Sequence, residues 1–227
     1  MRFNKLVMAF ATVAACVPAG SDARPPKVVI DYLPLLDLSC RTLTKAANTE
    51  AVVDELGRRL PQFRSAWAAN GPPLLAQAER TARTPFRFRE TRAALHGCRG
   101  LPSMSLPLTI NMEPHLRAAV GDAVEPDFVF VNTVFHEVLH RYVSDTLLPT
   151  GTPLLRRYAS EPPPVRGHLH LFALETLVYR RLGRDAELAG AIAQENKLRG
   201  ALAFQRARAI VAAEGPERFV AELTARR

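Results

Sequence analysis

Cysteine, aromatic residues and long apolar runs are all scarce in this 227-residue sequence. Three cysteines are too few for a small domain held together by several disulfides. Outside the extreme N-terminus, no apolar run reaches the roughly 18 residues that a membrane-spanning helix needs, which excludes a protein with several membrane spans. Hydrophobic residues at 48% and charged residues at 23% are globular values, and they exclude a disordered chain. The length fits one domain of about 200 residues.

The motifs of several enzyme classes are also absent. The sequence has no Gly-x-Ser-x-Gly turn for a serine nucleophile and no glycine-rich loop for phosphate. Cys40 and Cys98 lack the Cys-x-x-Cys spacing. His96 and His115 stand alone, and we expect them in turns or on the surface. One candidate motif for an enzyme active site remains, the pentapeptide at residues 136–140.

Residues 1–23 have the three-part layout of a secretory signal peptide. Arg2 and Lys5 form the positive region, and Leu6–Ala15 is an apolar stretch too short to span a bilayer. The alternative is a buried N-terminal helix. The layout predicts an exported protein that is periplasmic, anchored at the outer membrane, or secreted.

Two kinds of processing fit the end of this segment. Val13–Cys16 resembles the bacterial lipobox, in which the cysteine is lipidated and becomes the first residue. We favour this interpretation because Cys16 lies directly at the end of the apolar region. Val17–Ala19 or Ser21–Ala23 could instead serve an ordinary signal peptidase. In the first case, the lipidated Cys16 attaches the mature protein to a membrane.

Cys40 and Cys98 then remain as an even pair in an oxidising compartment, which predicts a disulfide between them. In the chain-entropy model such a bridge contributes roughly 4 kcal/mol of stability. Two free buried thiols are the alternative.

The formal net charge is +8 at pH 7, and most of the basic residues are arginines. The densest basic stretch consists of Arg80, Arg83, Arg87, Arg89 and Arg92. No nucleic-acid-binding motif accompanies it, so we expect no nucleic-acid partner. In an exported protein such residues suit anionic envelope polymers or lipid head groups, and the simplest interpretation is a solvated basic surface.

The pattern of apolar residues predicts a helix-rich α+β domain over residues 24–227. We expect strands at Lys27–Tyr32, Pro85–Glu90 and Leu106–Met112. We expect helices at Thr49–Leu60, Gln62–Ala69, Pro72–Arg83, Phe128–Val143, His168–Leu182 and Asp185–Ala213, the last with an interruption near Gly200, and a final short helix from Pro216. Proline or glycine separates several of these segments.

Residues 136–140 read His-Glu-Val-Leu-His, an HExxH motif. Residues four apart on a helix share a face, so His136 and His140 can bind one metal ion, for which zinc is the usual occupant. Glu137 lies about 100° further round the helix. There it can take a proton from the water that the metal activates without being a ligand itself.

The residues around the motif place this helix against a core. Val131, Val134 and Val138 project opposite the two histidines. A helix with this pattern has its back in the core and its histidine face towards a cleft. Two partly buried histidines without a metal are the alternative.

This helix, with the strand before it and a helix after it, resembles the zincin metallopeptidases. The resemblance implies a small sheet packed on the HExxH helix, a zinc cofactor, and hydrolysis of peptide bonds. In zincins an edge strand ahead of the motif helix pairs with extended substrate backbone, and Leu106–Met112 stands in that order. The metzincin subclass is excluded, because it needs a histidine at the position of Thr146.

In gluzincins, a glutamate on a following helix completes the metal site, and Glu175 is the corresponding residue here. Its neighbours Leu174, Leu177 and Val178 are apolar, and a carboxylate among them is costly to bury unless it is paired or bound to a metal. The alternative is a glutamate on the helix surface, paired with Arg181 or another arginine.

The same helix offers further candidates. His168 shares a face with Glu175 and could hydrogen-bond a developing oxyanion or replace Glu175 as a ligand, whereas His170 points away. Tyr179 is a second oxyanion candidate. In thermolysin-like enzymes an aspartate often stands at the position of Tyr179, so the residue that orients a ligand histidine is not identified by this resemblance.

The sequence therefore predicts an exported zinc peptidase with His136, His140 and Glu175 as ligands and Glu137 as the general base. Its substrate would be a peptide or protein. Two other functions stay open: an envelope lipoprotein with a binding or assembly role, and a metal-dependent amidase acting on cell-wall material. An intact Glu137 favours the two enzymes, because a binding site has no need of a base.

Overall fold

The computed structural model describes residues 24–45, 49–147, 151–198 and 200–225. The predicted signal segment, with Cys16, lies outside the described residues. The described chain is 68% helical and contains a small four-stranded mixed sheet, which confirms the expected helix-rich α+β class. In the part of the chain that the structure covers, no helix has the length and apolar character that crossing a bilayer requires.

The sheet has the strand order β1-β2-β4-β3. Strands β1 (Lys27–Tyr32), β2 (Glu90–His96) and β4 (Leu108–Asn111) run parallel, and the two-residue β3 (Met104–Ser105) pairs antiparallel with β4. Strand β1 has the predicted bounds. Because β4 is paired on both sides, it is not the edge strand that the zincin resemblance implied, and β3 forms that edge instead.

The predicted strand at Pro85–Glu90 is wrong, since β2 begins only at Glu90. The alternation of apolar residues there is real, because Phe86 and Phe88 are both buried. However, the amide of Phe86 donates to the Glu79 carboxylate and the amide of Arg87 to the Thr146 hydroxyl, so this segment bonds to side chains and not to a neighbouring strand.

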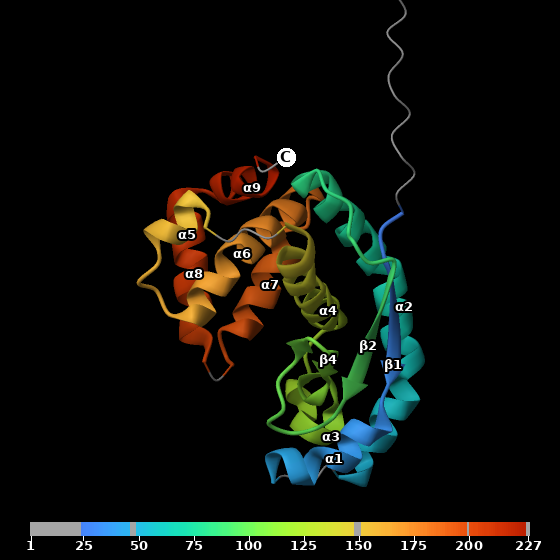
Figure 1. Ribbon diagram of the computed structural model, residues 1–227. Coiled ribbons are helices and arrows are strands. Elements are labelled where there is room, and N and C mark those ends of the chain that lie inside the picture. The colour runs from blue at the N-terminus through green and yellow to red at the C-terminus, as the bar shows by residue number, and fades with distance from the viewer. Residues whose placement is uncertain (1–23, 46–48, 148–150, 199, 226–227) are drawn as a thin grey trace, which may run out of the picture.

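Helix α2 (Glu50–Ala82) runs through Pro61, Pro72 and Pro73, where we expected interruptions. Thr49 caps its start by accepting a hydrogen bond from the amide of Val52. Each internal proline removes one helical hydrogen bond, and Figure 1 shows that α2 bends along its length. A continuous buried face offsets this cost by packing on β1 and on the helices that contain residues 127–142 and 163–181. This face consists of Val52, Leu56, Phe63, Trp67, Leu74, Leu75 and Ala78.

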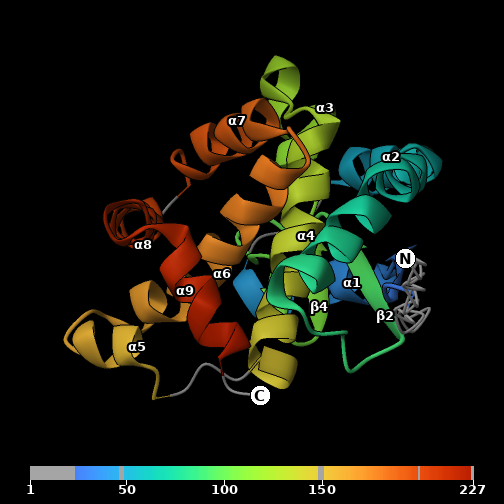
Figure 2. The ribbon, with the colours of Figure 1, turned by 90° about the horizontal axis from the view of Figure 1, so that it is seen from above.

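The remaining helices of the described chain include α4 (Asp127–Tyr142), which lies at the centre of the fold. The others are α1 (Pro34–Thr44), α3 (Arg117–Val120), α5 (Pro153–Arg157), α6 (Pro163–Arg181), α7 (Asp185–Glu195), α8 (Ala201–Glu214) and α9 (Pro216–Thr224). Short 3-10 turns at Glu113–His115 and Gly121–Ala123 precede α4, and a π-helical turn at Val143–Leu147 follows it. Figures 1 and 2 show α4 between α2 and the sheet on one side and α6 to α9 on the other.

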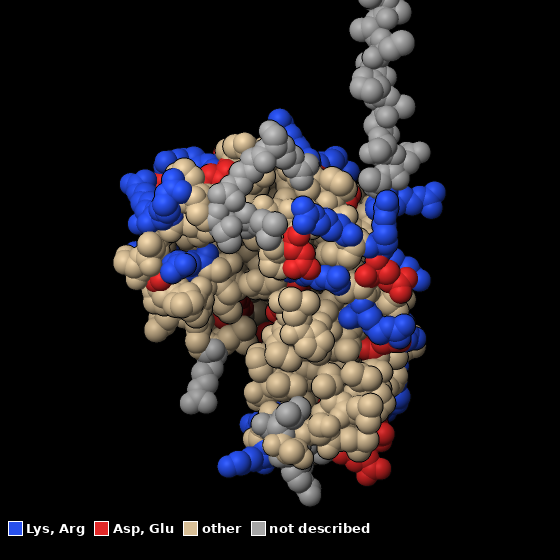
Figure 3. Space-filling model, viewed as in Figure 1, with Lys and Arg blue, Asp and Glu red and all other residues tan. Residues whose placement is uncertain are grey.

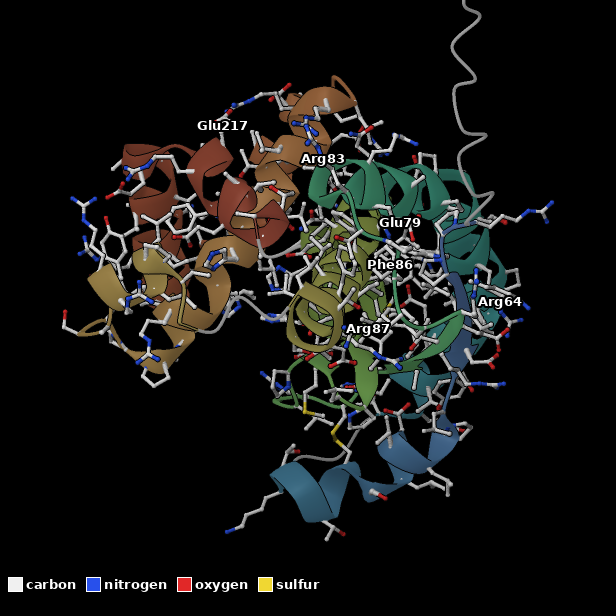
Figure 4. The ribbon with its side chains drawn as sticks, turned by 45° about the horizontal axis from the view of Figure 1, so that its top comes forward. Arg64, Glu79, Arg83, Phe86, Arg87 and Glu217 are labelled. Carbon is white, nitrogen blue, oxygen red and sulfur yellow. A yellow bond between two sulfur atoms is a disulfide. The ribbon has the colours of Figure 1, made fainter. Side chains whose placement is uncertain are left out.

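The structure contains the expected disulfide between Cys40 and Cys98, drawn in yellow in Figure 4. It joins α1 to the segment that follows β2. Beside it, the amide of Gly97 donates to the Asp37 carboxylate, so a covalent and a polar contact both join α1 to the segment after β2.

His115 ends the 3-10 turn Glu113–His115, so the expected turn is confirmed, but its side chain lies in the core and not on the surface. Its side chain packs against Phe63 and Phe130, with ring centroids 6.5 and 5.9 Å away, and its residue is 2% exposed. Burial, aided by the positive charge of Arg59, lowers the pKa of His115 to about 4. The neutral form is therefore the one that the fold accepts.

This burial predicts a loss of stability in mild acid. An unfolded histidine has a pKa near 6.5, so between about pH 6.5 and pH 4 the unfolded chain binds the proton more tightly and the free energy of unfolding falls, by up to about 3 kcal/mol. His115→Gln, measured by urea unfolding in the presence of chelator, should flatten this part of the curve. Parallel pH curves for the variant and the unmodified protein would contradict the assignment.

Candidate metal centre

Three histidines from two helices, α4 and α6, converge at one place. Nε2 of His140 lies 3.1 Å from Nε2 of His136 and 3.1 Å from Nε2 of His168. His136 and His140 are on α4, and His168 is near the start of α6. In a tetrahedral site with zinc–nitrogen bonds of about 2.1 Å, the ligand nitrogens are about 3.4 Å apart. The three side chains are therefore close enough to bind one metal ion.

Helix α4 can hold these histidines firmly because most of its other surface is buried. Val131, Val134 and Val138 are at most 1% exposed, which confirms that the back of the helix lies in the core. His136 and His140 are only partly buried. Figure 3 shows a hollow with acidic atoms in its depth, between the part formed by α5 to α8 and the part below it that contains β4 and α3.

The outer nitrogens of two histidines have partners that fix where their protons lie. Nδ1 of His168 is 2.6 Å from the carbonyl oxygen of Pro164. A carbonyl only accepts hydrogen bonds, so Nδ1 carries the proton and Nε2 of the neutral ring keeps its lone pair. Nδ1 of His136 faces Oε1 of Glu175 at 3.7 Å, which favours the same arrangement.

Glu175, which we expected to be the third ligand, lies behind His136 and is not among the three groups that converge. Its residue is fully buried, and its Oε2 accepts a hydrogen bond of 2.9 Å from Arg208 of α8. On α6, Glu175 lies two helical turns after His168. The imidazole of His168, and not the Glu175 carboxylate, takes the position of the third ligand. The alternative is right about the pairing, because Glu175 is paired with an arginine, Arg208, but wrong about a position on the helix surface. Arg181 instead bonds to Thr81.

The other two candidates on α6 point away from the three histidines. Tyr179 is buried and packs against Phe135 and Arg184, at 6.1 and 5.9 Å, so the structure does not support its expected role at an oxyanion. Burial raises its pKa. His170 points away from the face of His168, as the sequence indicated, and its Nε2 lies 2.9 Å from Oε2 of Glu222 on α9.

Burial and neighbouring charges give the three imidazoles different proton affinities. Burial opposes a charge on His136, but the Glu175 carboxylate outweighs burial and raises the pKa of His136. Burial and then the charge of His136 lower the pKa of His140 to about 2 and that of His168 to about 4. Without a metal, His136 is therefore the first of the three rings to bind a proton, and a metal ion would compete with that proton.

Glu137 and Glu175 have opposite electrostatic environments. Burial raises the pKa of Glu137, and only the charge of His136 lowers it. Burial acts on Glu175 in the same direction, but Arg208 and His136 outweigh burial and lower its pKa. Glu175 is thus a fixed negative charge, whereas Glu137 can exchange a proton closer to neutral pH.

Two phenylalanines, which the sequence analysis missed, form an apolar wall beside the histidines. The ring centroid of Phe172 lies 5.1 Å from that of His168, and the centroid of Phe204 lies 4.7 Å from it. The guanidinium of Arg208 covers Phe172 at 3.7 Å. The position of Phe172 beside His168 could have been predicted from the sequence, because Phe172 follows His168 by one helical turn. Phe204 and Arg208 belong to α8, which carries no motif.

A search of protein-family models, curated proteins and solved structures finds no match to this chain. The geometry of the three histidines and the two glutamates is therefore the basis for any functional conclusion.

Replacing His168 tests its place as the third ligand. His168→Gln should weaken zinc binding by more than about 100-fold, because two histidines leave the coordination shell short of protein ligands. His170→Gln on the same helix is the matched control, since His170 faces Glu222. Calorimetric titration with zinc checks both variants. Equal zinc affinity in the two variants would contradict this arrangement.

Replacing Glu175 tests its contact with His136. Glu175→Gln should weaken zinc binding by about 10- to 100-fold, because the amide does not support the Nδ1 proton as a carboxylate does. Glu195→Gln is the control, since Glu195 also binds Arg208, at 2.7 Å, but belongs to α7 and is not next to Nδ1 of His136. The same calorimetric titration with zinc measures both variants, and an equal loss of zinc affinity in each would show that only the pairing with Arg208 matters.

Proposed function

We propose that this protein is an exported, zinc-dependent hydrolase of the zincin type that cleaves peptide bonds. The observation that carries the proposal is the convergence of three imidazole nitrogens, two of them from the HExxH motif that also contains Glu137. The ligand set differs from that of gluzincins, because a histidine and not a glutamate stands at the third corner.

The donor set suits zinc. Three neutral imidazoles with a fourth position left open form a common ligand set of catalytic zinc sites. When bound there, zinc supplies a Lewis acid that lowers the pKa of a water molecule and polarises a carbonyl. His136, His140 and His168 would hold the ion, and Glu175 and Pro164 would hold the rings of His136 and His168 in place.

Glu137 is suited to the proton transfers. Its residue is 9% exposed and its pKa is raised, so its affinity for a proton is closer to that of the water it must deprotonate. In the proposed reaction its carboxylate takes a proton from the attacking water and passes it to the leaving amine. Glu175, held by Arg208, has no such freedom and serves to orient His136.

The sheet supports a peptide as the substrate. Strands β3 and β4 both pack against α4, and β3 is the edge strand on that side. The backbone of an extended peptide can add to such an edge. The edge is only two residues long, so we expect it to hold a short stretch of substrate.

Two features support export. The first 23 residues have the layout of a signal peptide, and the disulfide between Cys40 and Cys98 is of a kind that persists in oxidising compartments. The proposed location is therefore the cell envelope or the medium.

The decisive variant is Glu137→Gln. The amide cannot take a proton, so hydrolysis of a peptide library should fall by about 100-fold or more while zinc content stays at one ion per chain. Glu125→Gln is the matched control, because Glu125 is a partly buried glutamate ahead of α4 whose pKa is also raised by burial. Mass spectrometry of the products and metal analysis of the same samples provide the measurement.

Chelator should abolish the activity of the unmodified protein, and added zinc should restore it. Full activity in Glu137→Gln, or activity that survives removal of the metal, would contradict the proposed function.

A further inference from the structure

A strongly basic surface lies at the end of the sheet where the described chain begins. We call it the basic face and define it by eight residues: Arg24, Lys27, Arg64, Arg80, Arg83, Arg87, Arg89 and Arg92. Three acidic residues lie among them: Asp31, Glu79 and Glu90. Eight basic and three acidic side chains leave a charge of +5, which is most of the +8 of the whole chain.

The topology gathers most of these residues where β1 and β2 start, and Arg64 and Arg92 lie further along the strands, where both pair with Asp31. Strands β1 and β2 are parallel, and the amide of Lys27 bonds to the carbonyl of Arg89, so both strands start there. Helix α2 ends at the same place, with Arg83 as its left-handed C-cap. Figure 4 shows Arg83 and Arg87 on either side of Glu79 and Phe86, with Arg64 beside β1.

The acidic neighbours offset only part of the positive charge of this surface. Asp31 is shared by Arg64 and Arg92, at 2.6 and 2.7 Å, and Glu90 pairs with Lys27 at 3.6 Å. Asp145, whose carbonyl accepts a hydrogen bond from Arg87, has its carboxylate paired with Arg141. In Figure 3 blue atoms predominate in this region, outside the hollow.

We propose that the basic face binds the anionic head groups of a lipid bilayer. The chain reaches this face at Arg24, eight residues after Cys16, the cysteine that the lipobox pattern would lipidate. Eight extended residues span at most about 29 Å, so a lipid on Cys16 would hold the basic face close to the membrane. A basic patch beside a lipid anchor is a common second signal for stable attachment. The inference does not depend on the metal centre.

The occupant is a lipid surface and not a nucleic acid, for two reasons. The sequence predicts export, and it contains no nucleic-acid-binding motif.

Each arginine near an anionic membrane strengthens binding to that membrane about fivefold at physiological salt, and the attraction weakens as the salt concentration rises.

Vesicle sedimentation with the full chain tests this. The readout is the ratio of the partition coefficient onto vesicles with 30% phosphatidylglycerol to that onto neutral phosphatidylcholine vesicles, so any apolar contribution of residues 1–23 enters both values. The combined variant Arg83→Asn, Arg87→Gln and Arg89→Gln should lower this ratio by about 100-fold. Asn is chosen at residue 83 because it tolerates the left-handed backbone there, with φ of 51°.

The control variant loses the same charge elsewhere: Arg99→Gln, Arg156→Gln and Arg166→Gln, at the far end of β2 and on α5 and α6. It should change the ratio by less than about threefold. Equal losses in the two variants, or no preference of the unmodified protein for anionic vesicles, would overturn the proposal. Tighter binding to duplex DNA or to an anionic polysaccharide than to the vesicles at the same salt would overturn it as well, in favour of a polymer ligand.

Discussion

The meeting of α4 and α6 around three imidazole nitrogens is the constraint on which the site depends. Nε2 of His140 lies 3.1 Å from Nε2 of His136 and from Nε2 of His168. Lone pairs that face one another in a partly buried place repel unless a proton or a metal ion lies between them. The back of α4 is buried in the core, and α6 packs on α8 and α9, so neither helix can turn its histidines away. The fold thus holds open a place for a cation.

Glu175 and Glu137 have different roles in the proposed site because the surroundings of their carboxylates differ. Arg208 binds Glu175 and keeps it charged behind His136, where it can orient the ring. Burial raises the pKa of Glu137, and only the charge of His136 opposes burial. Environments that separate the pKa values of two glutamates are typical of sites where one group orients and the other transfers protons. The proposed hydrolase follows from this division.

Local patterns predicted much of this arrangement. The HExxH spacing and the valines behind it placed α4 correctly, and β-branched residues marked β1 with its exact bounds. The third corner could not be assigned, because helical periodicity puts His168 and Glu175 on the same face but does not say which of them lies nearer to α4. Arg208, which decides the role of Glu175, comes from α8 and is joined to it only by the tertiary fold.

Anomalous diffraction at the zinc absorption edge, from crystals of the zinc-loaded protein, tests the central claim most directly. We expect one peak about 2.1 Å from each Nε2 atom of His136, His140 and His168, with Glu175 still bonded to Arg208. A zinc ion bound by the Glu175 carboxylate, or no zinc between α4 and α6, would contradict this account.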